Sequence, residues 1–112
     1  MIGIMESVVA KQILESKRTE LEALCREYVV HRLEVFGSAS SESFDPKTSD
    51  FDFLVEFGEP PEHIGGVYQY FDFKDELESL YGRKVDLVEI AAVKKQRFFD
   101  VIKPQRRLLY AA

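Results

Sequence analysis

The residues of this chain that are best placed to do chemistry are two aspartates two positions apart, Asp50 and Asp52. They begin the segment Asp-Phe-Asp-Phe-Leu-Val-Glu-Phe (50–57), whose aromatic and aliphatic residues predict a strand. Because side chains alternate along a strand, both carboxylates leave the same face. Two such charges roughly 5 Å apart repel by about 3 kcal/mol at an effective dielectric constant of about 20. A divalent cation removes this repulsion, and Mg²⁺ prefers one or two carboxylates together with phosphate oxygens and water.

A third aspartate, Asp86, lies in the segment Lys-Val-Asp-Leu-Val-Glu (84–89), which predicts another strand. If this strand pairs beside 50–57, Asp86 projects beside Asp50 and Asp52. Three carboxylates on one sheet face are enough to hold two Mg²⁺ ions for an in-line displacement at phosphorus. Asp50 and Asp52 would bind the ion on the substrate's phosphates. Asp52 and Asp86 would bind the ion that lowers the pKa of the attacking hydroxyl. The alternative is that Asp86 faces water on an edge strand.

Gly37 and Ser38 form a candidate phosphate-binding turn directly after the predicted strand 32–36. Glycine lets the backbone turn sharply and approach a ligand closely. Ser38 offers a hydroxyl and an N–H group, and a helical turn beginning near it would direct free N–H groups at a phosphate. Gly-Ser is also common in ordinary turns. It indicates a phosphate-binding turn only in combination with the aspartates that follow.

Hydrophobic periodicity predicts the elements that position these residues. Apolar residues recur at helical spacing over 7–28 and 67–80, and Gly82 follows the second stretch as a terminating residue. Strands are predicted at 32–36, 50–57 and 85–88, loops at 39–49 and 58–66, and a last helix at 94–102, before Pro104. The order of these elements predicts an α/β fold in which a small mixed sheet packs against helices.

The predicted helix at 67–80 is apolar around more of its circumference than a free helix needs. Val67, Tyr70, Phe71 and Phe73 together indicate that part of this helix contacts another chain. Such an aromatic stretch can also stack a nucleobase. At helical spacing, however, core packing or a partner interface is the favoured interpretation.

The combined motifs resemble the minimal nucleotidyltransferase domain of the DNA polymerase beta-like superfamily. The chain has Phe-Gly-Ser at 36–38, then eleven residues, then Asp-Phe-Asp at 50–52, and a later strand aspartate in Gly-Arg-Lys-Val-Asp-Leu-Val (82–88). The superfamily's pattern is a hydrophobic residue, Gly-Ser, a loop, Asp-x-Asp and a later strand aspartate. Many members also carry an arginine soon after Gly-Ser. This chain has none there, so the phosphate charge would fall to Lys47 or Arg83.

The resemblance covers nearly the whole chain and implies a polymerase-beta-like core that binds two Mg²⁺ ions and a nucleoside triphosphate. Gly37 and Ser38 would then cradle the triphosphate. Asp50, Asp52 and Asp86 would be the catalytic metal ligands, with Asp86 nearest to a general base. Short members of this family usually act as antitoxins, transferring AMP from ATP onto a tyrosine of a HEPN-domain ribonuclease toxin. The expected partner is therefore a HEPN toxin, through which the chain could also form an oligomer.

Two other functions remain open at this stage. The chain could be a non-catalytic antitoxin that blocks a HEPN toxin by direct contact. It could also transfer a nucleotide to a small molecule such as an antibiotic, although enzymes of that kind usually carry an additional helical domain. Mass analysis of the toxin, or a screen of aminoglycoside acceptors, would distinguish these functions.

The charge of the chain is divided unevenly. Its 112 residues carry 15 Lys and Arg against 20 Asp and Glu, a net charge of −5. Residues 1–93 hold nine basic and nineteen acidic side chains, whereas residues 94–112 hold six basic side chains and only Asp100 as an acid. The acidic body argues against direct nucleic-acid binding, because neutralisation of phosphates dominates such affinity. The basic end could contact a partner, a nucleic acid or the chain's own acidic surface.

Length and composition predict one domain spanning 1–112. Cys25 is the only cysteine, which excludes an internal disulfide framework and a cysteine-rich zinc site. The first residues lack the features of a signal peptide, and no apolar stretch approaches the roughly 18 residues of a membrane span. We therefore expect a cytoplasmic protein without membrane contact.

Overall fold

The centre of the protein is a mixed four-stranded sheet. The computed structural model describes residues 8–37, 50–94, 96–102 and 106–112. The strands are β1 (Val30–Phe36), β2 (Phe51–Phe57), β3 (Val85–Glu89) and β4 (Arg107–Ala111), in the spatial order β3-β2-β1-β4. β1 is antiparallel to both β2 and β4, and β2 is parallel to β3. The α/β class and the mixed sheet predicted from the sequence are confirmed.

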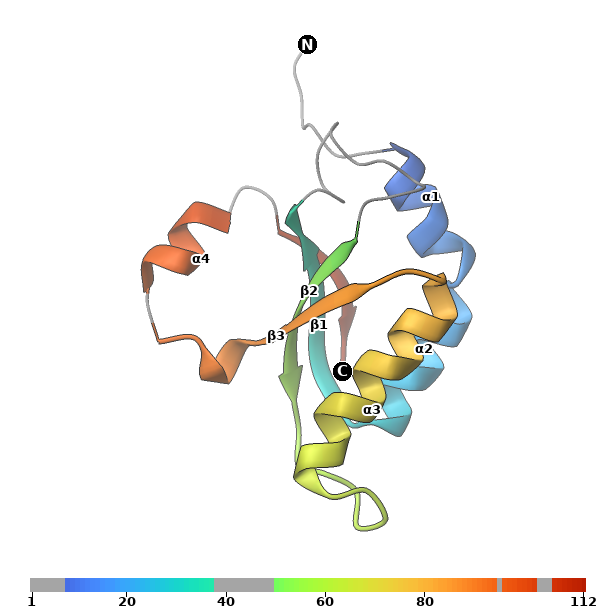
Figure 1. Cartoon of the computed structure of the whole chain (residues 1–112), viewed down its shortest axis with the longest axis vertical. Helices are drawn as coiled ribbons and strands as arrows, with labels where there is room; N and C mark the ends of the chain where they lie inside the picture. Colours follow the sequence, from blue (N-terminus) through green and yellow to red (C-terminus); the bar gives the residue numbers. More distant parts are fainter. Residues whose placement is uncertain (1–7, 38–49, 95, 103–105) are drawn as a thin grey trace.

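The helices cover the two faces of this sheet unequally (Figure 1). They are α1 (Val8–Ser16), α2 (Arg18–Glu27), α3 (Gly66–Tyr81) and α4 (Gln96–Ile102), with a short 3₁₀ turn at Ile90–Ala92. Figure 1 shows α1, α2 and α3 on one side of the sheet and the short α4 on the other. None of the described helices combines the length and the apolar character needed to cross a membrane.

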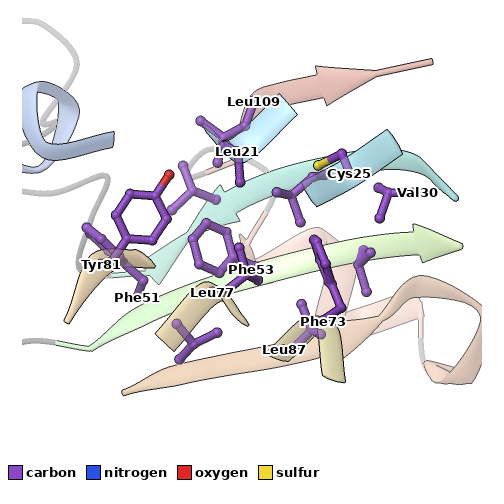
Figure 2. Packing of buried hydrophobic residues seen from close by; sticks show 14 of the residues in the cluster. Leu21, Cys25, Val30, Phe51, Phe53, Phe73, Leu77, Tyr81, Leu87 and Leu109 are labelled. Carbon is purple, nitrogen blue, oxygen red and sulfur yellow. The ribbon is translucent and has the colours of Figure 1, made fainter. Parts of the chain in front are cut away.

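The hydrophobic core lies between the sheet and α1, α2 and α3 (Figure 2). Alternate strand residues point into it, and each contributes a large side chain that is almost fully buried: Leu33, Val35, Phe51, Phe53, Val55, Val85 and Leu87. From the helices, Leu21, Phe73 and Leu77 pack against these strand residues. Cys25 is also buried in this core, as its place in the sequence predicts. The alternate residues of the same strands, which include Glu34, Asp52 and the fully buried Leu54, therefore occupy the other face of the sheet.

The single helix predicted over 7–28 is wrong in one respect, because the structure divides it at Lys17. The backbone of Lys17, at φ −114° and ψ 22°, leaves the helical conformation. The run from Glu15 to Glu20 is polar, so between Leu14 and Leu21 few apolar side chains hold the helix to the core. Ser16 also donates its hydroxyl to the Ile13 carbonyl at 2.7 Å, a local bond that competes with regular helix geometry.

α3 ends where the sequence predicts. Gly82 adopts the left-handed conformation, with φ 64°, and its N–H donates to the carbonyl of Glu78 at 2.8 Å. The chain then turns directly into β3. This crossover from β2 through α3 to β3 makes the two strands parallel, and it determines which of their residues are neighbours.

β4 is a strand that periodicity does not reveal. Only Leu109 of its five residues is buried, and Leu108 remains 46% exposed, so the segment lacks a clear alternation. Contacts distant in sequence hold it in place: it pairs with β1, and Arg18 of α2 donates a hydrogen bond to the carbonyl of Leu109. The preceding helix is also shorter than predicted, beginning at Gln96.

Candidate active site

Two of the predicted catalytic aspartates are direct neighbours on the open face of the sheet. Asp52 of β2 and Asp86 of β3 are partners in the parallel register. Partnered residues of adjacent strands point to the same face, and their backbones lie about 4.8 Å apart. The side chains that flank Asp52, those of Phe51 and Phe53, are fully buried on the helix-covered face. The two carboxylates therefore share the opposite face, where Asp52 is half-buried and Asp86 is exposed.

Asp50 lies at the same end of the sheet but outside β2. It directly precedes the strand and is exposed. Among the described residues, no group of three or more His, Cys, Asp or Glu side chains lies close enough to hold a metal ion. The backbone thus pairs Asp52 with Asp86, whereas Asp50 does not complete a three-carboxylate cluster. Two oxygen-bearing side chains on one face still suit Mg²⁺, which binds one or two carboxylates and takes its other ligands from phosphates and water.

Gly37 makes room for the carboxylate of Asp52. Phe36, the last residue of β1, is the register partner of Asp52, and Gly37 follows it with φ 75°. A Cβ atom at Gly37 would overlap Oδ2 of Asp52 and lie 3.1 Å from its Cγ. The predicted glycine turn therefore passes close beneath a predicted metal ligand. Ser38, the other half of the candidate phosphate-binding turn, lies outside the described residues, as does Lys47.

The open face continues from the aspartates toward aromatic and basic side chains. The ring of Phe36 lies 6.0 Å from that of Phe98 on α4, nearly perpendicular to it at 85°. Phe99, the next residue of α4, lies 5.8 Å from the guanidinium carbon of Arg106. α4 therefore closes this face on the β1 side, and the β3 side remains open at Asp86.

This arrangement of sheet, glycine turn and paired aspartates can be compared with known proteins. The nucleotidyltransferase domain family matches residues 17–109, which is most of the chain. This chain is a member of the nucleotidyltransferase domain family.

Two relatives of this nucleotidyltransferase come from Methanocaldococcus jannaschii, and both bear the name "putative protein adenylyltransferase". The first is 36% identical over 83 residues, covering 74% of this chain and 80% of the relative. The second is 35% identical over 78 residues, covering 70% and 81%. The shared sequence therefore includes most of each protein.

Solved structures show the same fold. A minimal nucleotidyltransferase structure superposes with a TM-score of 0.68 at 26% identity, covering 86% of this chain and 92% of the other. A toxin–antitoxin structure with AMP-PNP gives a TM-score of 0.62 at 19% identity, covering 85% and 73%. A structure of a tri-AMPylated HEPN toxin from Shewanella oneidensis in complex with MNT antitoxin gives a TM-score of 0.61 at 17% identity. The match covers 88% of this chain and 73% of the other.

The nucleotidyltransferase also contains a buried acidic residue that sequence reasoning missed. Glu34 of β1 is only 2% exposed and lies on the open face, between core residues of the other face. It accepts hydrogen bonds from Nε of Arg32 at 2.6 Å and from Nε and Nη2 of Arg106 at 2.5 and 3.0 Å. Burial raises the pKa of Glu34, but the hydrogen bonds from Arg106 and Arg32 outweigh it and hold the pKa below its ordinary value.

Part of the basic end of the chain thus contacts the protein's own acidic side chains. Arg106 is 72 residues from Glu34, and Arg107 approaches Glu15 of α1 at 3.8 Å. The sequence left three possible contacts for the basic end: a partner, a nucleic acid or the chain's own acidic surface. Arg106 and Arg107 contact the chain's own acidic side chains. Arg83, the other predicted phosphate cation, lies 4.8 Å over the ring of Phe51, which belongs to the covered face. Each of these contacts joins residues far apart in the sequence, so local periodicity does not predict them.

Proposed function

We propose that this nucleotidyltransferase transfers AMP from ATP to a hydroxyl group of a HEPN-type toxin, in a reaction that depends on Mg²⁺. The observation that carries the proposal is the pairing of Asp52 with Asp86 above Gly37. The names of relatives support it. Two are called "putative protein adenylyltransferase", and similar folds occur in a HEPN–MNT complex and in a toxin–antitoxin structure with AMP-PNP. The exposure of Asp86 allows a bulky acceptor to approach.

Each proposed site residue has a distinct task. Asp52 and Asp86, which are register partners, would hold Mg²⁺, with Asp50 at the same end of the sheet as the predicted third ligand. The two ions would neutralise phosphate charge and activate the acceptor hydroxyl. Gly37 and Ser38 would place their backbone N–H groups at the triphosphate. Gly37 is suited to this task because its backbone is uncovered by a side chain and lies against Asp52.

The proposed reaction is a single displacement at the α-phosphorus of ATP. The acceptor oxygen forms a bond to that phosphorus, and the bond to the oxygen bridging the α- and β-phosphates breaks. Pyrophosphate leaves with the electron pair of the broken bond. The proton of the acceptor hydroxyl passes to Asp86, which faces the open side of the sheet from which an acceptor can approach. Positioning and charge neutralisation carry most of the rate enhancement in such transfers.

Intact mass spectrometry of the toxin tests this proposal. A HEPN-domain toxin is mixed with ATP, Mg²⁺ and catalytic amounts of enzyme. We expect mass increments of one or more AMP groups with the wild type, and a loss of rate of more than about 100-fold with Asp52→Asn or Asp86→Asn. Asp75→Asn, at an exposed position on α3, is the matched control and should retain the rate. Undiminished transfer by Asp52→Asn would overturn the proposal.

The non-catalytic alternative has its own signature in the same assay. The double variant Asp50→Asn/Asp52→Asn is tested, in the presence of ATP and Mg²⁺, for relief of toxin ribonuclease activity. Loss of relief supports the transferase. Full relief, with no mass increment from the wild type, would identify a toxin-blocking module instead.

A further inference from the structure

An apolar groove runs along the free edge of the sheet. β3 is the outermost strand on this side, and the groove of about 600 Å³ lies between it and the beginning of α3. Its walls include Val67, Tyr70 and Phe71 from α3 and Leu87, Val88 and Glu89 from β3. The groove is distinct from the face that carries the paired aspartates but adjoins the same strand.

The α3 wall of the groove is unusually apolar for an exposed helix surface. The lining residues Val67 and Phe71 are 69% and 56% exposed, and their neighbour Tyr68, which does not line the groove, is 63% exposed. Phe73 and Leu77 of the same helix are fully buried in the core, so these exposed residues do not serve it. Burying one such side chain contributes about 1.5–3 kcal/mol. Three of them within five residues, beside a groove, indicate a surface that another molecule covers.

The edge of β3 is arranged for side-chain contacts rather than for an added strand. The hydroxyl of Tyr70 donates a hydrogen bond to the carbonyl of Leu87 at 2.5 Å. This bond occupies an acceptor that an incoming strand would need, which is a common protection of sheet edges. An amphipathic helix requires no such acceptor and inserts its apolar side chains into a groove of this kind.

Charge indicates the polarity of the occupant. Among the described residues that line the groove, Glu89 is the one that carries a charge, and it is only partly exposed. The protein also carries excess negative charge over residues 1–93. A helix that fills the groove should therefore present a lysine or arginine to Glu89, because an acidic partner would be repelled.

The groove adjoins the strand that carries Asp86. Leu87 and Val88 follow Asp86 along β3, and a strand advances about 3.3 Å per residue. We propose that the groove between α3 and β3 docks an amphipathic, basic helix of the acceptor protein, and that docking there brings the acceptor hydroxyl to Asp86. This inference rests on the proposed function and identifies the surface through which that function selects its acceptor.

Variants of the groove test the inference without disturbing the core. Phe71→Glu introduces charge at an exposed position, and Glu89→Lys reverses the charge of the wall. Calorimetric titration with the HEPN protein should show affinity reduced by about tenfold or more for each variant. The KM for the acceptor should rise accordingly, with little change in kcat at saturating acceptor. Val101→Glu, which alters a 63% exposed valine on α4, is the matched control and should bind as the wild type does.

The outcomes separate the docking surface from the chemistry. Titration with AMP-PNP should give wild-type affinity for Phe71→Glu, which shows that the variant is folded. If the wild type binds the HEPN protein through this groove but transfers no AMP, the docking surface is supported and the proposed transferase function is overturned. If Phe71→Glu binds and modifies the acceptor as the wild type does, the docking proposal is overturned. A wild-type dimer that Phe71→Glu dissociates without loss of acceptor binding would assign the groove to a second copy and also overturn it.

Discussion

The carboxylate of Asp52 occupies the space in which Gly37 would carry a side chain. β1 can therefore end directly beneath a proposed metal ligand only because residue 37 has no Cβ atom. The backbone there has φ 75°, a conformation that side chains disfavour. Steric and conformational requirements for glycine thus coincide at one position.

Substitution of this glycine should affect activity more than stability. We expect Gly37→Ala to lower the free energy of unfolding by about 1–2 kcal/mol from the unfavourable φ, and to abolish AMP transfer by displacing Asp52. Gly82→Ala is a matched control, because Gly82 also has positive φ but nothing lies within 4 Å of its Cβ position. Urea unfolding and transfer rates are measured on both. Equal loss of activity in the two variants would show that strain, rather than the contact with Asp52, is responsible.

The ion pairs of Glu34 should stabilise the fold above acidic pH. Glu34 has a lowered pKa in the folded protein, so the unfolded chain takes up a proton at higher pH than the folded chain does. Its contribution is therefore complete above the unfolded value near 4.5 and is lost as the pH falls through the folded value. We expect Glu34→Gln to lower the free energy of unfolding by about 2 kcal/mol at pH 7, and by less at pH 3.

A control for this effect is Glu15→Gln. Glu15 pairs with Arg18 at the surface, where its side chain is 42% exposed. Such pairs contribute less than about 1 kcal/mol, so Glu15→Gln should unfold nearly as the wild type does. Urea titrations at several pH values compare the two variants. A loss for Glu34→Gln that is no larger than that for Glu15→Gln would show that the buried network contributes little.

Cys25 should be inert in the folded protein. It is fully buried, and burial raises the pKa of its thiol to about 12. The reactive thiolate is therefore scarce at pH 8. We expect a thiol reagent such as Ellman's reagent to label Cys25 only as fast as the protein opens, and rapidly in urea. Fast labelling under native conditions would contradict the burial of α2 against the sheet.

Local pattern predicted the elements of the site, and only tertiary structure revealed how they meet. The alternation around Asp52 and Asp86 marked two strands, because buried aromatic and aliphatic residues flank each aspartate. Their direct pairing depends on the α3 crossover, which sets a parallel register between residues 34 positions apart in sequence. The sequence also predicts that Asp50 joins them. Asp50 directly precedes β2, so the alternation of the strand does not fix the direction of its side chain, and its place in the site stays a prediction.

The parts of the fold that pattern did not predict depend on long-range contacts. β4 has one buried residue and is held by β1 and by Arg18, neither of which is near it in sequence. Likewise, Glu34 resembles an ordinary polar residue on the outer face of a strand until Arg106 is placed beside it. This pairing could not be anticipated from either residue alone.

Mg²⁺-dependent binding of a non-hydrolysable nucleotide tests the central claim most directly, because it requires neither acceptor nor turnover. AMP-PNP is titrated calorimetrically into the wild type, Asp52→Asn, Asp86→Asn and the Asp75→Asn control, with Mg²⁺ or with EDTA. We predict that Mg²⁺ tightens binding by about tenfold or more in the wild type and the control, and that both site variants lose most of this gain. The same Mg²⁺-dependent gain in Asp52→Asn and Asp86→Asn would contradict the claim that these paired carboxylates hold the metal.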